Sequence, residues 1–369
     1  MLTIPLYKPF LDKHVIKNVN LCLTSSWISS KGKFINEFEK KFSNFTKIKH
    51  SVTLTSGTTA LHIALKSLSI SSLDEVIVPS LSFVASVNCV KYVNACPVFV
   101  DVKKDSWIID ESLIEKKINK RTKAIIAVHL YGVPCNLSKL KKIAKKHSLY
   151  LIEDCAEALG SYYDNKHVGS FGDVSIFSFY GNKTITTGEG GMIVTNNKKI
   201  AERCDYLKKQ ALIKGSYYRH GELGYNYRMT NICASIGSAQ MNNIKKILKK
   251  KKIIADFYHQ NLKYMPIKFQ SYDKKNIVNS HWLVSFTVKR KHLRDKLMKF
   301  LLKKGIETRP VFYPIHKMKI YTTHKKNDMK NTEYISQNGI SLPSYPQLEK
   351  KEILYICEKI KDFFNKTYA

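Results

Sequence analysis

The 369-residue sequence has no long apolar run. A membrane-spanning helix needs roughly 18 consecutive apolar residues, and no stretch of the chain approaches that length. The N-terminal MLTIPLYKPFLDKHV is broken by two prolines and by charged residues before an apolar run is long enough for a signal peptide. We therefore expect no membrane insertion and a cytoplasmic location.

The sequence also lacks the cysteine patterns of metal and redox sites. Its eight cysteines are scattered, without a C-x-x-C pair or a histidine at metal-ligand spacing. We expect reduced core thiols and no metal ion. Cys155 follows the acidic residue Asp154 and could be mistaken for a nucleophile, but a small buried side chain is the simpler interpretation.

Acidic residues are scarce: 29 Asp and Glu face 62 Lys and Arg, which gives a formal charge of +33. The lysines are spread along the whole chain, and the run at 249–252 lies in an amphipathic helical pattern, which is typical of a solvated helix face. We expect no nucleic-acid partner, because no basic stripe is evident. Attraction to anionic nucleotide-sugars, or compositional drift, would explain the excess.

Short apolar runs alternate with helical patterns between about residues 48 and 195. The runs include SVTLT, EVIVPS, CPVFVDV, AIIAVHLYG, LYLIEDCA, DVSIFSF and GGMIVTN. This alternation predicts an α/β fold with a mostly parallel sheet that is covered on both faces. Hydrophobic residues make up 44% of the chain, enough for a substantial core.

The pattern changes after about residue 240. A lysine-rich helix is expected over about 240–262, then a strand in WLVSFTV, a helix in HLRDKLMKFLLKKG and a final helix over about 348–365. We expect a large domain over 1–245, with an N-terminal arm over about 1–30, and a smaller C-terminal α+β domain over 246–369.

The segment SIFSFYGNKTITTGEGGMIVTN is the most informative in the chain. A core strand leads into a polar turn that holds Lys183, followed by a glycine-rich stretch and another strand. A lone lysine in a turn is usually a solvated surface residue. Held in a pocket after a core strand, however, its amine can lose its proton and attack a carbonyl carbon.

A carboxylate ends an earlier strand. In LYLIEDCAEALG the strand finishes at Asp154, and in parallel sheets the carboxyl ends of strands border the ligand crevice. A pyridine cofactor needs an acid at its ring nitrogen, because a protonated nitrogen makes the ring an electron sink. The alternative for Asp154 alone is a helix N-cap.

Two further features belong at the same edge of the sheet. In TLTSGTTALHIAL the chain passes from a strand through Ser56, Gly57 and Thr58 into a helix, whose free amides can bind a phosphate, although simple helix capping has the same signature. Phe83 follows the next strand and could lie flat on a ring, or be a core aromatic. Only the set is persuasive: a lysine, an acid, a phosphate site and an aromatic ring are what pyridoxal phosphate requires.

Longer segments resemble a known family. These are SSWISSKGKFINEFEKKF, TSGTTALHIAL, DEVIVPSLSFVASVN, AVHLYG, LIEDCAEALGS, GDVSIFSFYGNKTITTGEGGM, YNYRMTNICASIGSAQ and RPVFYPIHKMKIY. They are similar to the DegT/DnrJ/EryC1/StrS sugar aminotransferases, and the resemblance covers nearly the whole chain. It implies the fold-type-I architecture of aspartate aminotransferase.

The resemblance also implies roles for individual residues. Lys183 would carry pyridoxal 5'-phosphate and shuttle protons. The other cofactor contacts would be Asp154 at the pyridine nitrogen, Glu157 near the ring hydroxyl, Ser56, Gly57, Thr58 and Ser178 at the phosphate, and Phe83 on the ring. Asn226 would reach the phosphate of a neighbouring subunit, which implies a homodimer with shared active sites. The substrate-side residues would be Trp27, Lys31, Arg228 and His316.

The implied reaction moves an amino group from L-glutamate to C4 of a nucleotide-linked 4-keto-6-deoxy sugar. The wording SFYGNKTITTGEGG, EDCAEALG and YRMTN most resembles members that act on GDP-4-keto-6-deoxy-D-mannose, for surface polysaccharides such as the O-antigen of lipopolysaccharide. A dTDP- or UDP-linked sugar is the alternative, as is a non-catalytic binding or regulatory protein of the same fold. A related dehydratase has histidine in place of the lysine, so Lys183 favours transamination.

Overall fold

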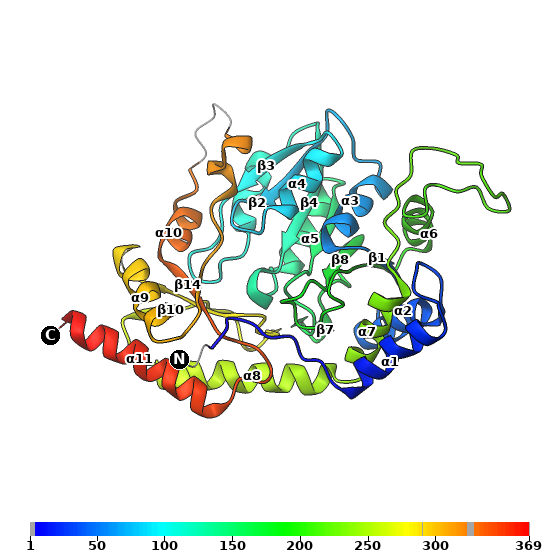
Figure 1. Cartoon of the computed structure of the whole chain (residues 1–369). Coiled ribbons are helices and arrows are strands. Elements are labelled where there is room, and N and C mark those ends of the chain that lie inside the picture. Colours follow the sequence, from blue (N-terminus) through cyan, green and yellow to red (C-terminus); the bar gives the residue numbers. More distant parts are fainter. Residues whose placement is uncertain (1–3, 290, 323–327, 369) are drawn as a thin grey trace.

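The centre of the molecule is a seven-stranded sheet in the order β1-β9-β8-β5-β4-β2-β3 (Figure 1). The computed structural model describes residues 4–289, 291–322 and 328–368. The strands are β1 His50–Leu54, β2 Glu75–Pro79, β3 Cys96–Val100, β4 Thr122–Val128, β5 Tyr150–Asp154, β8 Val174–Ser178 and β9 Gly191–Thr195. Only β9 is reversed, since it pairs antiparallel with both β1 and β8. The prediction of a mostly parallel sheet is confirmed.

Helices cover both faces of this sheet because its central strands are apolar on both sides. Alternate residues of β2 enter two different cores: Val76 and Val78 pack with one set of helices, and Ile77 packs with another. The first set comprises α3 Gly57–Ser67, α4 Ala85–Tyr92 and α6 Lys198–Leu207, and the second core is completed by α5 Leu137–Lys146.

An aromatic cluster anchors three helices beside β8 and β9. The helices are α1 Lys13–Thr24, α2 Lys33–Thr46 and α7 Asn231–Met241. Phe38 and Phe42 of α2 are fully buried, and their ring centroids lie 5.0 Å and 5.6 Å from that of Phe179. This packing holds the chain just after β8, where the turn with Lys183 begins.

The C-terminal third forms a four-stranded antiparallel sheet in the order β10-β12-β14-β13. Its strands are β10 Ile267–Phe269, β12 Val284–Val288, β13 Arg309–Pro310 and β14 Gly339–Leu342. The helices of this part are α8 Ile244–Asn261, α9 Lys291–Lys303, α10 Lys330–Asn338 and α11 Lys350–Tyr368. A small third sheet consists of β6 Tyr162–Tyr163, β7 Lys166–His167 and β11 Ile277–Val278. Short 3₁₀ turns are η1 Glu111–Leu113, η2 Glu115–Lys117, η3 Leu130–Gly132, η4 Ile315–Lys317 and η5 Lys319–Tyr321.

Several segments connect the two larger sheets. Figure 1 shows α8 running along the base of the molecule from the region of α7 to α11. Ile4 bridges to Ile306, so the start of the described chain lies on the C-terminal part. Conversely, β11, which comes from the C-terminal third of the chain, pairs with β6, which follows β5 of the large sheet. The domain division at about residue 245, and the arm over 1–30, stay predictions.

Two expectations need correction. All eight cysteines are free thiols and six are buried, but Cys233 is half-buried and Cys96 is exposed, because Cys96 begins β3 at the edge of the sheet. Lys251, within the lysine run at 249–252, is buried rather than solvated. It lies on the inner face of α8 at helical spacing with Ile247, Ile254 and Tyr258, which are also buried.

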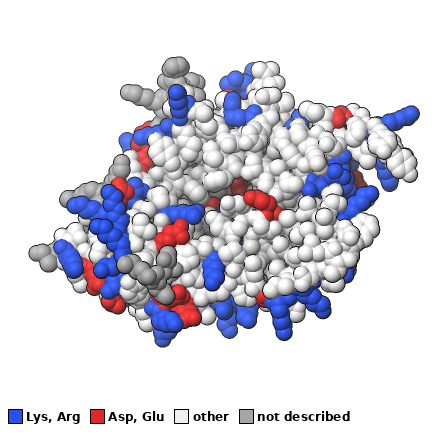
Figure 2. All heavy atoms as spheres, viewed as in Figure 1, with Lys and Arg blue, Asp and Glu red and all other residues white. Residues whose placement is uncertain are grey.

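The charged side chains show no continuous basic stripe on the face drawn in Figure 2. Lysine and arginine lie mainly around its edges, and uncharged atoms cover most of its centre. Among the described helices, none combines the length and the apolar composition needed to span a membrane.

The contact between α7 and α2 gives a test of the packing. A Cβ atom added to Gly237 would lie 2.6 Å from ring atoms of the buried Phe38. We expect Gly237→Ala to lower the free energy of unfolding by about 1–3 kcal/mol through overpacking, despite the better helix propensity of alanine. Gly181→Ala is the control, because its Cβ would meet nothing within 4 Å. Equal stability of the two variants in urea unfolding would contradict this packing.

Candidate active site

A pocket of about 290 Å³ lies where the parallel strands of the large sheet end. Residues that follow β1, β2 and β8 border it, together with the last residues of β4, β5 and β8 and two aromatic residues of the C-terminal part. Its lining includes Ser56, Gly57, Thr58, Ser82, Phe83, Ser86, Asp154, Glu157, Ser178, Tyr180, Asn182, Lys183, Glu189, Trp282 and Phe312. Eight residues predicted from the sequence are therefore brought together: Ser56, Gly57, Thr58, Phe83, Asp154, Glu157, Ser178 and Lys183.

Lys183 lies in the turn after β8, and its side chain is only 13% exposed. Its Nζ is 4.0 Å from the centroid of the Trp282 ring and 3.8 Å from Oε1 of Glu157. Burial lowers the pKa of the amine, while the charges of Glu157 and Asp154 oppose that shift. The amine of Lys183 therefore loses its proton more readily than that of an exposed lysine, and the neutral amine is the nucleophile.

Glu157 is the acidic neighbour of this amine. Its Oε2 accepts a hydrogen bond of 2.8 Å from the backbone N–H of Tyr131, a buried residue in left-handed conformation at φ 54°. Burial raises the pKa of Glu157 to about 7, although the charge of Lys183 pulls it down. Burial disfavours the charge on both groups, so a proton is shared between Lys183 and Glu157 more evenly than in an exposed pair.

Asp154 is the last residue of β5 and is 6% exposed. Its Oδ2 accepts a hydrogen bond of 2.7 Å from the Ser86 hydroxyl, and its Oδ1 accepts one of 3.1 Å from the N–H of Ala156. No helix begins between β5 and β6, where every residue is described, so the helix N-cap alternative fails. Asp154 is a carboxylate fixed on the pocket wall.

The first turn of α3 forms a cradle at another side of the pocket. Ser56 caps the helix through its hydroxyl, which accepts from the N–H of Thr59 at 3.1 Å. A Cβ atom on Gly57 would lie 2.8 Å from Cβ of Ser178, so this close approach requires glycine. Amides at a helix start have no partner within the helix, and they suit an anion such as a phosphate.

Aromatic rings complete the pocket, and most of them were not expected. Tyr131 is stacked between Trp282 and Phe312, with centroid distances of 5.7 Å and 5.5 Å. Phe83 is 55% exposed, and its ring is tilted by 56° to that of Phe312. Trp282 and Phe312 lie more than 95 residues beyond Lys183, and only the rarity of tryptophan, three in the chain, marked Trp282 as unusual.

The other predicted site residues lie outside this pocket. Lys31 and Arg228 border a second cavity, and Arg228 Nη2 donates to the exposed Asn226 at 3.0 Å. Trp27 is 56% exposed beside a third cavity. His316 Nδ1 lies 2.6 Å from the Ser80 hydroxyl, and its Nε2 lies 3.3 Å from Glu333. The roles of these residues stay predictions.

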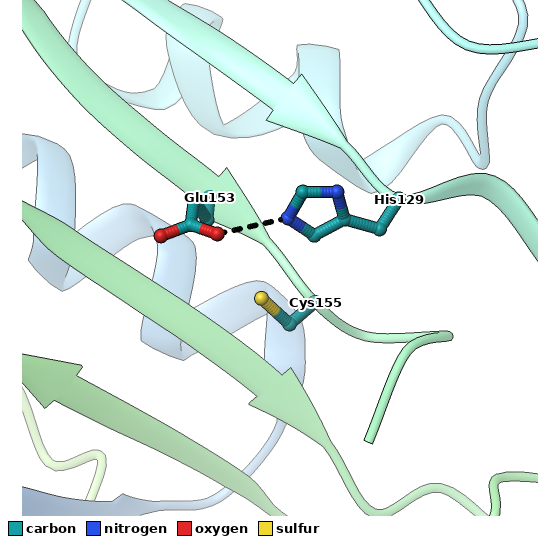
Figure 3. Close-up of side chains that lie close together, drawn as sticks. All are labelled: His129, Glu153 and Cys155. Carbon is teal, nitrogen blue, oxygen red and sulfur yellow. Dashed lines mark hydrogen bonds and ion pairs between the residues drawn. The ribbon is translucent and has the colours of Figure 1, made fainter. Parts of the chain in front are cut away.

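His129, Glu153 and Cys155 form a buried cluster close to the pocket (Figure 3). Nδ1 of His129 accepts from the N–H of Cys135, so Nε2 carries the hydrogen that is donated to Glu153 at 3.0 Å. Further acceptor positions of Glu153 are filled by the loop amides of Gly169, Phe171 and Gly172 at 2.7–2.8 Å.

These contacts leave no lone pairs organised for a metal ion. Burial alone would raise the pKa of Glu153, but the hydrogen bonds from His129 and from the loop amides of Gly169 and Gly172 lower it. Burial also raises the pKa of the Cys155 thiol, which therefore stays protonated and is a poor nucleophile. The cluster ties β4, β5 and the 169–172 loop together and fits the expectation of a buried Cys155.

The pocket fits pyridoxal phosphate on the chemistry of its donors. It presents a desolvated amine at Lys183, a carboxylate at Asp154 and a helix start at Gly57 in one cavity. In the described part of the chain, Oδ1 of Asn182 is also buried without a hydrogen-bond partner, as expected where a ligand supplies the missing donor.

The sequence matches the DegT/DnrJ/EryC1/StrS aminotransferase family over residues 9–361. The chain belongs to this family. Aminotransferases of the family depend on pyridoxal phosphate, which is therefore the cofactor of this enzyme. The prediction of the family, made from the segments around Lys183 and Asp154, is confirmed.

Individual members of the family are close in sequence and structure. The chain is 47% identical over 362 residues to a protein of Escherichia coli O157:H7 named GDP-perosamine synthase, with 98% of this chain and 99% of that protein covered. A protein of the same name from Vibrio cholerae is 44% identical over 365 residues, at 98% and 99% coverage. The PLP form of Spr1654 from Streptococcus pneumoniae superposes with a TM-score of 0.94 at 28% identity, covering 99% of each chain. This confirms the fold-type-I architecture.

The raised pKa of Glu157 predicts a pH dependence of stability. In the cofactor-free protein the folded state holds this proton up to about pH 7, whereas the unfolded chain releases it near the usual 4.5. The folded state then binds more protons, so the free energy of unfolding falls as pH rises through this window. We expect Glu157→Gln to flatten that fall in urea unfolding measured at several pH values. Parallel curves for the two proteins would contradict the assignment.

The buried network of Glu153 gives a second prediction. Glu153→Gln removes the charged acceptor of five donors, one of them the Ser175 hydroxyl at 3.4 Å, so we expect the free energy of unfolding to fall by about 3–5 kcal/mol. Glu202→Gln, at a side chain that is 65% exposed, should change it by less than about 0.5 kcal/mol. Added zinc should leave the melting temperature of the parent protein unchanged, and a zinc-dependent rise would show that the cluster is a metal site after all.

Proposed function

We propose that this enzyme transfers the amino group of L-glutamate to C4 of GDP-4-keto-6-deoxy-D-mannose and so makes GDP-perosamine for a surface polysaccharide. The substrate is supported by the relatives named GDP-perosamine synthase, which match almost the whole chain at 47% and 44% identity. Nucleotide-sugars and glutamate are cytoplasmic metabolites, and the proposal includes that location.

The observation that carries the proposal is the placement of the Lys183 amine. It lies in the pocket with Asp154, 3.8 Å from Glu157, and burial lowers its pKa. Transamination needs one amine that first holds the cofactor and then moves a proton, and a lysine of lowered pKa can do both. Pyridoxal phosphate, when bound, supplies an electron sink for the negative charge that forms on carbon.

Each pocket residue has a defined task in this proposal. Asp154, fixed by Ser86, would hold the pyridine nitrogen in its protonated form. Glu157 would lie near the ring hydroxyl, and it is placed to exchange a proton with Lys183. Gly57, Thr58 and Ser178 hold the phosphate, with the start of α3 favouring its charge. Lys183, once released, would move a proton from the α-carbon of glutamate to the cofactor in the first half-reaction, and from the cofactor to C4 of the sugar in the second.

A homodimer is part of the proposal. Lys31, Asn226 and Arg228 carry polar or charged groups suited to phosphates, yet they lie outside the Lys183 pocket of their own chain. In a dimer they would reach the pocket of the partner chain, with Trp27 on the same side. His316 is assigned to the substrate side by family resemblance alone.

The substrate is tested by offering three ketones with pyridoxal phosphate and glutamate: GDP-4-keto-6-deoxy-D-mannose and the dTDP- and UDP-linked 4-keto-6-deoxyglucose compounds. We expect amination of the GDP sugar at C4, read by mass and sugar configuration, at a kcat/KM about 10²-fold or more above the others. Amination of a glucose-derived ketone alone would replace the substrate. Absence of any glutamate-dependent product would favour a non-catalytic protein, an alternative that the named relatives do not favour.

A further inference from the structure

A second buried lysine lies behind the active site. Lys251 of α8 is 1% exposed, and its Nζ donates to the carbonyl oxygens of Trp282 at 3.1 Å and Ser344 at 2.7 Å. The same nitrogen lies 5.3 Å from the centroid of the Tyr7 ring. One ammonium group therefore joins α8 to three segments that are far apart in the sequence.

Two of those segments touch Lys183. The ring of Trp282 lies over the Lys183 amine, and its Nε1 donates to the carbonyl of Asn182 at 2.7 Å. The hydroxyl of Tyr7 donates to the carbonyl of Lys183 itself. Lys251 thus holds both a residue that packs on the reactive amine and a residue that bonds its backbone.

Burying the charge of Lys251 costs free energy, which a side chain that only fills space would not require. Among the described side chains no carboxylate forms an ion pair with Lys251, and burial lowers its pKa to about 7. A methionine of similar length would fill the same space without that cost. The contacts toward Lys183 give a reason for the amine to be there.

We propose that Lys251 is a positioning residue that fixes Trp282 and Tyr7 around Lys183. The inference rests on the proposed role of Lys183. By holding the Trp282 backbone and the Tyr7 ring, Lys251 sets how far the Lys183 amine is shielded from water and where it points. Both properties govern the rate at which that amine attacks the aldehyde of pyridoxal phosphate and the rate of later proton transfer, whereas neither contributes to binding of the nucleotide.

The test compares Lys251→Met with Tyr258→Phe in the full-length protein. Tyr258 lies on the same face of α8, and its hydroxyl donates to the carbonyl oxygen of Pro343 at 3.0 Å rather than to that of Trp282. The first readout is the pH dependence of the rate at which cofactor-free protein develops the visible absorbance of lysine-bound cofactor. We expect Lys251→Met to slow this reaction about 10- to 100-fold and to shift its pH profile, with Tyr258→Phe unchanged.

The second readout is steady-state turnover. Lys251→Met should lower kcat by a similar factor and leave KM for the nucleotide-sugar within about twofold, because the misplaced group acts in the proton-transfer step. Wild-type rates in Lys251→Met, or an equal loss in Tyr258→Phe, would overturn the proposal. If the enzyme aminates no nucleotide-sugar, the absorbance readout still decides the role of Lys251.

Two milder variants cover a failure of Lys251→Met to fold. Trp282→Phe removes the donor to Asn182, and Tyr7→Phe removes the donor to Lys183, while both keep an aromatic ring at the position. We expect both variants to shift the pH dependence of the rate of cofactor attachment, and to shift it in the same direction. Profiles that match the parent protein in both variants would contradict the inference.

Discussion

The active site depends on removing one amine from water. Lys183 is buried against Trp282, whose ring lies over the amine, and the charges of Glu157 and Asp154 favour its protonated form. Desolvation disfavours the charged forms of both the amine and the carboxyl group, so a proton passes between them more easily than between two exposed groups. The catalytic properties of the site follow from this shared burial, and the rest of the fold maintains it.

Two parts of the fold keep Lys183 and Glu157 buried. The large sheet brings the ends of β1, β5 and β8 to one edge, which places the helix start at Gly57, the carboxylate of Asp154 and the Lys183 turn around one cavity. The C-terminal part closes that cavity with Trp282 and Phe312. The buried hydrogen bonds of Glu153 tie the strands together just behind Asp154.

The sequence located site residues best where they lie at or just after the end of an apolar strand. Lys183, Asp154 and Ser56 each come just after or at the end of an apolar run, so parallel pairing alone predicts that they meet. Trp282 and Lys251 could not be found in this way, since they reach the site only through tertiary packing. Lys251 was hidden in a lysine run, although its spacing from Ile247 and Ile254 is that of an inner helix face. Asn226 and Arg228 lie outside the pocket, and their assigned role needs a second chain that one sequence cannot position.

The identity of the lysine that holds the cofactor is the most direct test, because Lys251 also has a lowered pKa. Holoenzyme would be reduced with borohydride, digested and sequenced by mass spectrometry. We expect a single modified lysine, Lys183, within the peptide that follows β8. Modification of Lys251 or of a surface lysine, with Lys183 unmodified, would contradict it.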